Sequence, residues 1–172
     1  MGRDSGASGL SAREITVGYG KDAPILEGLS LDVLEGELTV IVGPNACGKS
    51  TLLRCLARVL GARSGVVELD GVELGTMNQK ALARRLGLLA QSSVAPGDML
   101  VEDLVARGRY PHHGLVRQWS AVDDEAVAGA MRDAGVSALA GRRVGELSGG
   151  QRQRVWIAMA LAQSTDILLL DE

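Results

Sequence analysis

The apolar positions of the chain fall into short runs, and two of these runs flank a loop that contains glycine. Residues 38–42 (Leu-Thr-Val-Ile-Val) form a short run rich in β-branched side chains, which predicts a buried strand. Beyond the loop, apolar residues recur at helical spacing until Gly61, which predicts a helix that ends there. These residues are Leu52, Leu53, Leu56, Val59 and Leu60. The pattern therefore predicts a strand, a loop and a helix in succession.

Alternating and β-branched runs elsewhere in the first half predict a small antiparallel layer. Residues 14–17 and 29–33 are typical of short, half-buried strands. The run 65–71 ends in Asp70-Gly71, a pair that favours a tight hairpin turn. The segment 1–12 before these strands is rich in Gly and Ser, and we expect it to be a disordered lead-in.

Helical patterns dominate the middle of the chain. Ser120 with Asp123 three residues later is a variant of the capping box, which predicts a helix start. One stripe of that helix is predicted to be buried: Val122, Ala126, Val127, Ala130, Met131 and Ala134. We expect His112 and His113 to be exposed loop residues. Residues 97–145 are therefore predicted to form a helical insert in an α/β chain.

Two more strands and two more helices complete the predicted fold. Residues 81–86 predict a short helix and 86–90 a buried strand that ends at Gln91. Residues 155–162 predict a buried helix. The apolar run 167–170 suits a strand of a parallel sheet that is buried on both faces. The predicted fold class is α/β, with a parallel-sheet core, an antiparallel β layer and the helical insert.

The loop at residues 43–50 (Gly-Pro-Asn-Ala-Cys-Gly-Lys-Ser) fits the phosphate-binding pattern G-x-x-x-x-G-K-[ST]. Backbone N–H groups of such a loop and of the following helix point at one anion, which the helix dipole also favours. Lys49 adds a positive charge for the β- and γ-phosphates, and the Ser50 hydroxyl can ligate Mg²⁺. Gly43 and Gly48 allow the backbone to approach the phosphates closely. The alternative is a glycine-rich turn before an ordinary helix.

A second candidate site lies at residues 147–151 (Leu-Ser-Gly-Gly-Gln), just before the predicted buried helix. Arg152 and Arg154 oppose the dipole of that helix by about 0.3–1 kcal/mol each at an exposed end. This conflict is explained if an anion binds at Ser148, Gly149 and Gly150. A Ser-capped helix with arginines in solvent explains the residues equally well, so both interpretations stay open.

A third candidate site is the carboxylate pair Asp171 and Glu172 at the end of the last predicted strand. Open α/β sheets bind ligands at the carboxyl ends of their strands. Asp171 has the chemistry to hold Mg²⁺ through water, and Glu172 that of a general base acting on an attacking water.

Composition narrows the functional classes. A net charge of -3 argues against a nucleic-acid surface, and two Trp, two Tyr and no Phe leave few rings on which bases could stack. Cys47 and Cys55 are expected to be reduced thiols. No stretch of the chain is apolar for long enough to predict a membrane span.

Four motifs, in order and at plausible spacing, resemble those of ATP-binding cassette (ABC) ATPases, which are P-loop NTPases with a RecA-like core. Residues 43–51 match Walker A, Gln91 the Q-loop, 147–151 the signature and 167–172 Walker B. The signature is the most specific, because other phosphate-loop ATPases lack it. The resemblance covers about residues 13–172. Two segments of the insert, 106–114 and 119–123, are similar to the iron–siderophore and haem/cobalamin importer branch, and we expect siderophore import.

The resemblance implies ATP and Mg²⁺ as cofactors and assigns roles to several residues. It implies that Tyr19 stacks on adenine and that the Walker A loop, including Asn45 and Thr51, binds phosphates and Mg²⁺. Gln91 would sense Mg²⁺ and the attacking water, and Glu172 would be the catalytic base.

The partners that the resemblance implies are transmembrane permease subunits and a second ATPase protomer. In the family, Ser148, Gly149 and Gly150 complete the ATP site of the other protomer in a head-to-tail dimer. Gln91 would couple the insert to the permease. An extracytoplasmic substrate-binding protein would act indirectly, and the expected location is the cytoplasmic face of the cell membrane.

Two departures from the family pattern matter. Ala46 stands where the family usually has Gly, so the loop is strained if this position needs a positive φ; we expect nucleotide binding to survive. The chain also stops at Glu172, where the family continues, and we expect an incomplete fragment that lacks the C-terminal part of the domain. Three alternatives stay open: a cobalamin or haem importer, a cassette ATPase acting on nucleic acid or ribosomes, and a chain that binds nucleotide without turnover.

Overall fold

The computed structural model describes residues 9–91, 94–113 and 119–171. These residues form two compact units. The first unit comprises residues 9–82 together with Asp171, and the second comprises residues 83–170.

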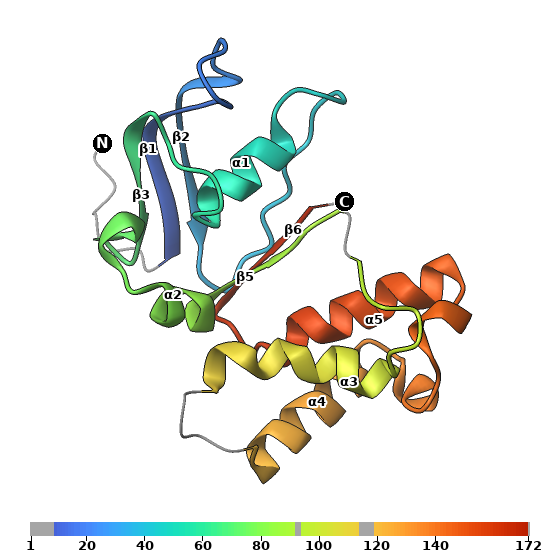
Figure 1. Cartoon of the computed structure of the whole chain (residues 1–172). Coiled ribbons are helices and arrows are strands. Elements are labelled where there is room, and N and C mark those ends of the chain that lie inside the picture. The colour runs from blue at the N-terminus through green and yellow to red at the C-terminus, as the bar shows by residue number, and fades with distance from the viewer. Residues whose placement is uncertain (1–8, 92–93, 114–118, 172) are drawn as a thin grey trace. The chain divides into compact units, whose positions relative to one another are not determined.

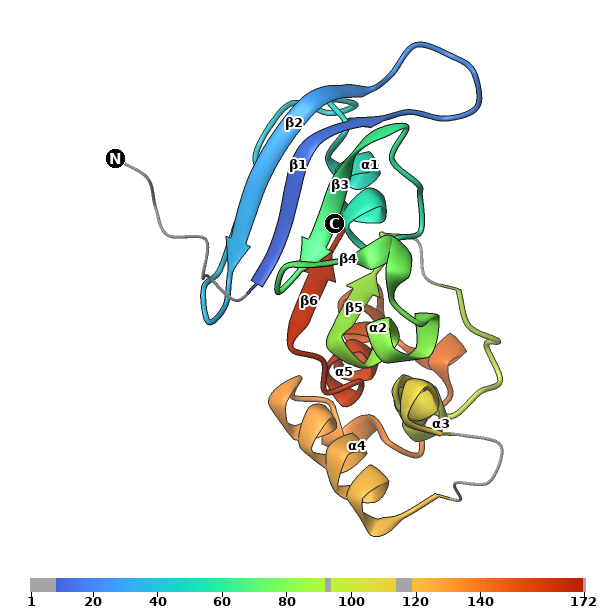
Figure 2. The ribbon, with the colours of Figure 1, turned by 90° about the vertical axis from the view of Figure 1, so that its left-hand side faces the viewer.

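The first unit is built on an antiparallel sheet. Its strands are β1 (Gly9–Val17), β2 (Leu26–Leu34), β3 (Ser64–Leu69) and β4 (Val72–Glu73), in the order β2-β1-β3-β4. Figure 2 shows β1 between its two long neighbours. The predicted antiparallel layer is present. The prediction that residues 1–12 are a disordered lead-in is wrong for residues 9–12. They belong to β1 because Leu10 and Ala12 are buried apolar residues that pair with both neighbouring strands. Residues 1–8 lie outside the described part.

A bulge in β1 keeps its apolar side chains on one face. The register toward β2 shifts between Ala12 and Ile15, where Glu14 takes a φ of 49°. Side chains alternate between the two faces of a strand, so one extra residue moves the apolar set from even to odd positions. Leu10 and Ala12 before the bulge and Ile15 and Val17 after it are each at most 1% exposed. The bulge therefore gives the sheet one continuous apolar face.

The hairpin from β3 to β4 has the predicted Asp-Gly turn. Asp70 and Gly71 have φ values of 51° and 75°, as the central residues of a type I′ turn do. The Asp70 Oδ1 atom accepts a hydrogen bond from the Gly9 N–H at 2.7 Å. The turn residue thus also holds the start of β1.

Helix α1 (Lys49–Leu56) follows the glycine-containing loop and buries Leu52, Leu53, Cys55 and Leu56. The predicted continuation to Gly61 is wrong. Arg58 takes a φ of 56°, and its guanidinium donates to the carbonyls of Leu74 and Met77 at 2.8 and 2.6 Å. A left-handed residue cannot continue an α-helix, so Val59 is 67% exposed. The 3-10 helix η1 (Leu74–Thr76) and α2 (Gln79–Arg85) follow β4.

The predicted strand at residues 38–42 is also wrong. The segment has no regular secondary structure, and Leu38, Val40 and Val42 are 90, 69 and 85% exposed. An apolar run forms a strand only where another strand supplies hydrogen bonds and a second layer covers the side chains. Within the described ranges, no strand pairs with this segment.

In the second unit, β5 (Leu86–Leu89) and β6 (Ile167–Leu170) pair in parallel, with Leu89 opposite Leu170. Figure 1 shows the two strands side by side. The parallel pairing agrees with the predicted strands, but burial on both faces is wrong. Leu169 is 6% exposed and Leu170 is 50% exposed. The two side chains point to opposite faces, and only the face of Leu169 is well covered.

The rest of the second unit is helical. Its elements are α3 (Val101–Ala106), η2 (Arg107–His112), α4 (Ala121–Asp133), η3 (Ser137–Leu139), η4 (Val144–Glu146) and α5 (Gly149–Ala162). Helices α3, α4 and α5 pack together around a core of aliphatic side chains (Figure 1). Helices therefore occupy much of the region 97–145. The limits of this region as a helical subdomain stay a prediction. None of the described helices is long and apolar enough to cross a lipid bilayer.

The start of α4 partly departs from the prediction. Ser120 and Asp123 form the predicted capping box, and Ala130 and Met131 are buried as expected. Val122, however, is 63% exposed. The inward position at this end of α4 belongs to Asp123, whose side chain is fully buried.

Candidate functional site

The loop at residues 43–50 leads directly into α1 and requires glycine at its last turn. Gly48 is the N-cap of α1, with a φ of 97°. A Cβ atom there would lie 2.9 Å from Cδ2 of Leu26 and 3.0 Å from Cγ2 of Ile25. The backbone conformation therefore favours glycine at this position, and a side chain would also require Leu26 and Ile25 to shift.

The Lys49 ammonium lies at this loop. Its Nζ atom donates hydrogen bonds to the carbonyl oxygens of Gly43 and Pro44 at 2.8 and 2.7 Å. A bound anion with several oxygen atoms would offer stronger, charge-assisted bonds than these two neutral carbonyls. The loop therefore carries a cation in a position to bind phosphate.

Ala46 in the same loop has a φ of 64°. The position does take the left-handed conformation, so the alanine methyl group strains the loop, by about 1 kcal/mol or more. Cys47 next to it is an exposed free thiol, whereas the free thiol of Cys55 is buried. Burial raises the pKa of the Cys55 thiol above its ordinary value.

Ser50 and Asp171 meet in the first unit. The Ser50 Oγ donates a hydrogen bond to the Asp171 Oδ1 at 2.7 Å. A hydroxyl and a carboxylate oxygen are donors that suit Mg²⁺, which is usually held by one or two protein groups together with phosphate oxygens and waters. Across the described residues there is no cluster of three or more His, Cys, Asp or Glu that could hold a metal by itself. The pair therefore fits an ion that the nucleotide helps to bind.

Tyr19 lies in the same unit and is 43% exposed. Its hydroxyl accepts a hydrogen bond from Nη1 of Arg54 on α1 at 3.1 Å. Hydrogen bonds to Thr51, which has the larger effect, and to Arg54 lower the pKa of Tyr19 below its ordinary value. These contacts link the tyrosine to the helix that follows the phosphate-type loop.

The loop that carries Tyr19 is held by Arg63. The Arg63 guanidinium donates to the carbonyl oxygens of Asp22, Tyr19 and Gly20 at 2.8, 3.2 and 3.1 Å. Neither Arg54 nor Arg63 was singled out from the sequence, because a lone arginine in a loop or on a helix carries no motif. Only the fold shows that both support Tyr19.

Ser148 at the second candidate site caps α5. Its Oγ accepts from the Gln151 N–H at 3.3 Å, and Gln151 Oε1 accepts from the Ser148 N–H at 3.0 Å. This is the capping box of the Ser-capped interpretation. Arg152 donates to the Leu147 carbonyl at 3.4 Å rather than only extending into solvent. Ser148, Gly149 and Gly150 are all exposed, so the cap leaves the helix start accessible to an anion.

The remaining candidates follow the two parallel strands. Gln91 is exposed and comes two residues after β5, and Asp171 directly follows β6. Glu172 lies outside the described residues. The first unit thus brings together Lys49, Ser50, Thr51 and Asp171, with Tyr19 linked through Arg54. The second unit contains Gln91 and the Ser148–Gly150 segment.

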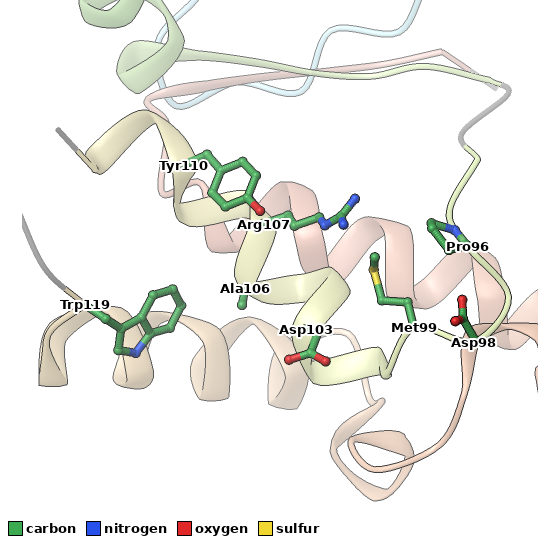
Figure 3. A pocket seen from close by; sticks show the side chains of 8 residues that line it. All are labelled: Pro96, Asp98, Met99, Asp103, Ala106, Arg107, Tyr110 and Trp119. Carbon is green, nitrogen blue, oxygen red and sulfur yellow. The ribbon is translucent and has the colours of Figure 1, made fainter. Parts of the chain in front are cut away.

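A pocket of about 630 Å³ in the second unit did not stand out in the sequence. Figure 3 shows its lining, which comes from residues between 96 and 110 and from Trp119. Asp98, Asp103 and Arg107 provide charge, and Tyr110 and Trp119 provide aromatic surface. Three of these five residues lie in the segments that suggested an importer branch, so that resemblance was the available signal.

His112 and His113 are not the exposed loop residues that were predicted. The Nε2 atom of His112 lies 2.7 Å from the Gln163 carbonyl oxygen. His113 stacks on Trp119 with 5.4 Å between ring centroids, and its side chain is 21% exposed. Both rings are partly buried because η2 packs against α5 and α4.

Comparison with known proteins places these features in a family. The model of the family described as "ABC transporter" matches residues 26–172. The chain is 52% identical over 163 residues to the ferric enterobactin transport ATP-binding protein of Escherichia coli (strain K12), covering 95% of this chain and 60% of that protein. It is 48% identical over 167 residues to a probable siderophore transport system ATP-binding protein of Bacillus subtilis (strain 168), covering 97% and 60%. The chain thus spans about 60% of the length of these relatives.

A solved structure supports the same assignment. A nucleotide-free ATP-binding cassette from an ABC transporter matches with a TM-score of 0.81 and 26% identity, covering 95% of this chain and 68% of that one. The predicted P-loop NTPase fold is therefore confirmed. With the Walker A loop leading into α1 and Ser148 capping α5, the chain belongs to the ABC transporter family, as part of its ATPase domain.

Proposed function

We propose that the protein binds and hydrolyses ATP with Mg²⁺ and thereby powers the import of a ferric siderophore through a membrane permease. The observation that carries the proposal is the hydrogen bond from Ser50 to Asp171 beside the Lys49 loop. The names of the relatives in Escherichia coli and Bacillus subtilis support the siderophore.

The loop and the start of α1 bind the phosphates in this proposal. Lys49 exchanges its bonds to the loop carbonyls for phosphate oxygens, and the backbone of the loop, including Gly43, Asn45 and Gly48, lines the same anion. Thr51 lies beside them at the start of α1 and bonds to Tyr19. Tyr19 stacks on the adenine ring, held by its own bond to Arg54.

Hydrolysis needs a metal ion and a base. Ser50 and Asp171 would hold Mg²⁺, and Gln91 would sense the ion and the attacking water. The ion would supply positive charge that neutralises the phosphate oxygens. Glu172 accepts the proton of that water as general base. The Asp171 carboxylate already accepts a bond from Ser50, which keeps both oxygen donors in place.

The signature segment serves a second copy of the protein. Ser148, Gly149 and Gly150 are exposed at the start of α5 and offer backbone N–H groups and a helix dipole to an anion. We propose that this anion is the γ-phosphate of ATP bound to the other protomer of a head-to-tail dimer. Each site then requires both protomers.

The pocket of the second unit is the surface we propose for the permease. Tyr110 and Trp119 offer apolar contact, while Asp98, Asp103 and Arg107 offer charges that select one partner orientation. In this proposal the protein works at the cytoplasmic face of the membrane. An extracytoplasmic substrate-binding protein delivers the siderophore to the permease, and no nucleic acid takes part.

The experiment that tests this function has two readouts on the full-length protein. Lys49→Ala is expected to abolish MgATP binding measured by calorimetry, whereas Lys80→Ala on α2 is expected to bind as the wild type does. Cells that depend on the protein are then supplied with radiolabelled ferric siderophore, haem or cobalamin. Unchanged binding in Lys49→Ala would contradict the phosphate site, and uptake of haem or cobalamin alone would replace the proposed cargo.

A further inference from the structure

The segment η2 (Arg107–His112) lies against the last turn of α5. A Cβ atom at Gly108 would collide with the carbonyl oxygen of Met159 and would lie 3.0 Å from the Cβ of Ala162. Only glycine permits this approach of the two backbones. The proposed ATP site does not use this segment.

Arg109 connects this segment to the end of α5. Its side chain is buried, and its Nη1 atom donates to the carbonyl oxygen of Ala162 at 2.9 Å and to Oγ of Ser164 at 3.1 Å. The last carbonyls of a helix have no partner within the helix, and a cation is favoured there. His112 lies beside the next carbonyl, with Nε2 2.7 Å from the oxygen of Gln163.

Asp123 of α4 orients Arg109. Its Oδ1 atom accepts from Nε of Arg109 at 3.0 Å, and its Oδ2 atom accepts from the N–H and hydroxyl of Ser120 at 3.1 and 2.7 Å. The Asp123 side chain is fully buried, so neither charge is screened by solvent. The planar guanidinium uses different N–H groups for Asp123 and for α5, which fixes its orientation.

The turn that accepts hydrogen bonds from Arg109 contains a residue in the left-handed conformation. Ser164 has a φ of 51°, although it is not glycine, and its N–H donates to the Leu161 carbonyl at 2.9 Å. After this left-handed residue, the chain reaches β6 within three residues. The bond from Arg109 to the Ser164 hydroxyl therefore stabilises a conformation that serine rarely adopts by itself.

From these contacts we infer that Arg109, oriented by Asp123, is a positioning residue for ATP turnover. It fixes the turn at 162–164, which joins the signature helix α5 to the strand that leads to Asp171. Helix α5 is one continuous helix of 14 residues, so a change of angle at its C-terminal end would displace Ser148 at the other end. This inference rests on the proposed function, since it concerns how the signature segment reaches its anion.

A purely structural role makes a different prediction. A buried ion pair that only supports the fold would lower stability when broken, and turnover would fall only as far as the folded fraction does. The two roles are separated by comparing variants of equal stability. Met131→Ala and Val136→Ala remove buried core side chains of the same unit and serve as controls.

The test uses the full-length protein assembled with its permease. We expect Arg109→Met to lower kcat about 10–100-fold relative to the control variant with the nearest Tm, as a displacement near 1 Å does at a reaction site. The Kd of MgATP is expected to stay within about twofold of that control, because the Lys49 loop belongs to the other unit. Equal kcat in Arg109→Met and its control would overturn the inference. If Arg109→Met does not fold, Arg109→Lys is compared in the same way.

A rescue and an exchange measurement complete the test. Adding Ser164→Gly to Arg109→Lys is expected to restore part of kcat, because glycine adopts the left-handed turn without help. No recovery would count against a role in holding the turn. Hydrogen exchange at the amides of Gln163 and Ser164 is expected to be faster in Arg109→Met than in the control. Failure of the wild type to bind MgATP would instead contradict the proposed function, and the exchange result would then still show whether Arg109 holds the turn at 162–164.

Discussion

Ser50 and Asp171 are 121 residues apart in the chain, yet the Ser50 Oγ donates to the Asp171 Oδ1 at 2.7 Å. One residue belongs to the helix that follows the phosphate loop, and the other directly follows β6. This hydrogen bond joins the Walker A and Walker B motifs, which the sequence shows only as separate segments. It is the basis for the metal-binding part of the proposal.

Replacing Ser50 with Ala is expected to raise the Mg²⁺ concentration needed for half-maximal ATPase activity about tenfold or more, because one of two protein oxygens is lost. Asp171→Asn is expected to act in the same direction. The measurement is a Mg²⁺ titration at saturating ATP. Ser137→Ala in η3 is the control, and a Mg²⁺ requirement of Ser50→Ala equal to that of the control would rule out Ser50 as a ligand.

Replacing Ala46 with Gly is expected to stabilise the protein by about 0.5–1 kcal/mol. Glycine removes the free-energy cost of the left-handed φ at this position. This gain exceeds the loss of stability that comes from the greater conformational entropy of glycine in the unfolded chain. Urea unfolding measures the change. Ala57→Gly, at a position with a φ of -83°, is the matched control and should destabilise instead. The same sign for both variants would contradict strain at Ala46.

The stability of the second unit is expected to fall in strong acid because the buried Asp123 carboxylate becomes protonated. Hydrogen bonding to Ser120, together with the bond to Arg109, lowers the pKa of Asp123 from 3.8 to about 2. The folded pKa lies below the unfolded one, so this contribution is complete above the unfolded pKa and is lost as the pH falls through the folded pKa.

Asp123→Asn should therefore remove a pH-dependent part of the unfolding free energy between about pH 4 and pH 2. Urea midpoints measured from pH 2 to pH 6 test this window. Asp133→Asn changes an exposed carboxylate of the same helix and is expected to leave the profile as in the wild type. A parallel profile for Asp123→Asn and wild type would show that Asp123 does not titrate as described.

Two substitutions of Tyr19 separate the contribution of its ring to MgATP binding from that of its hydroxyl. If the ring stacks on adenine, Tyr19→Ala should weaken MgATP binding by about 1–3 kcal/mol, the usual worth of a base on an aromatic ring. Tyr19→Phe keeps the ring and loses only the hydroxyl with its hydrogen bonds to Thr51 and Arg54, so its Kd should stay close to that of the wild type. Calorimetry measures both values. Equal losses in both variants would assign the effect to the hydroxyl instead.

Where local pattern decides structure, the sequence was a reliable guide. The Asp70-Gly71 hairpin and the capping box of Ser120 and Asp123 each depend on a few neighbouring residues. The order of the four motifs also identified the family without any coordinates. Such features are written in the chain because their physical causes act over a few residues.

Only tertiary structure decided the rest, because distant residues supply the partners. The run 38–42 has the composition of a strand, but within the described part of the chain no strand pairs with it. Arg58 ends α1 early through carbonyls that lie 16 and 19 residues away. The burial of Arg109 depends on Asp123 and on the end of α5. The sequence by itself determined the family, the phosphate loop and the local caps. Long-range hydrogen bonds and packing decided which apolar runs became strands and which arginines bond to distant parts of the chain.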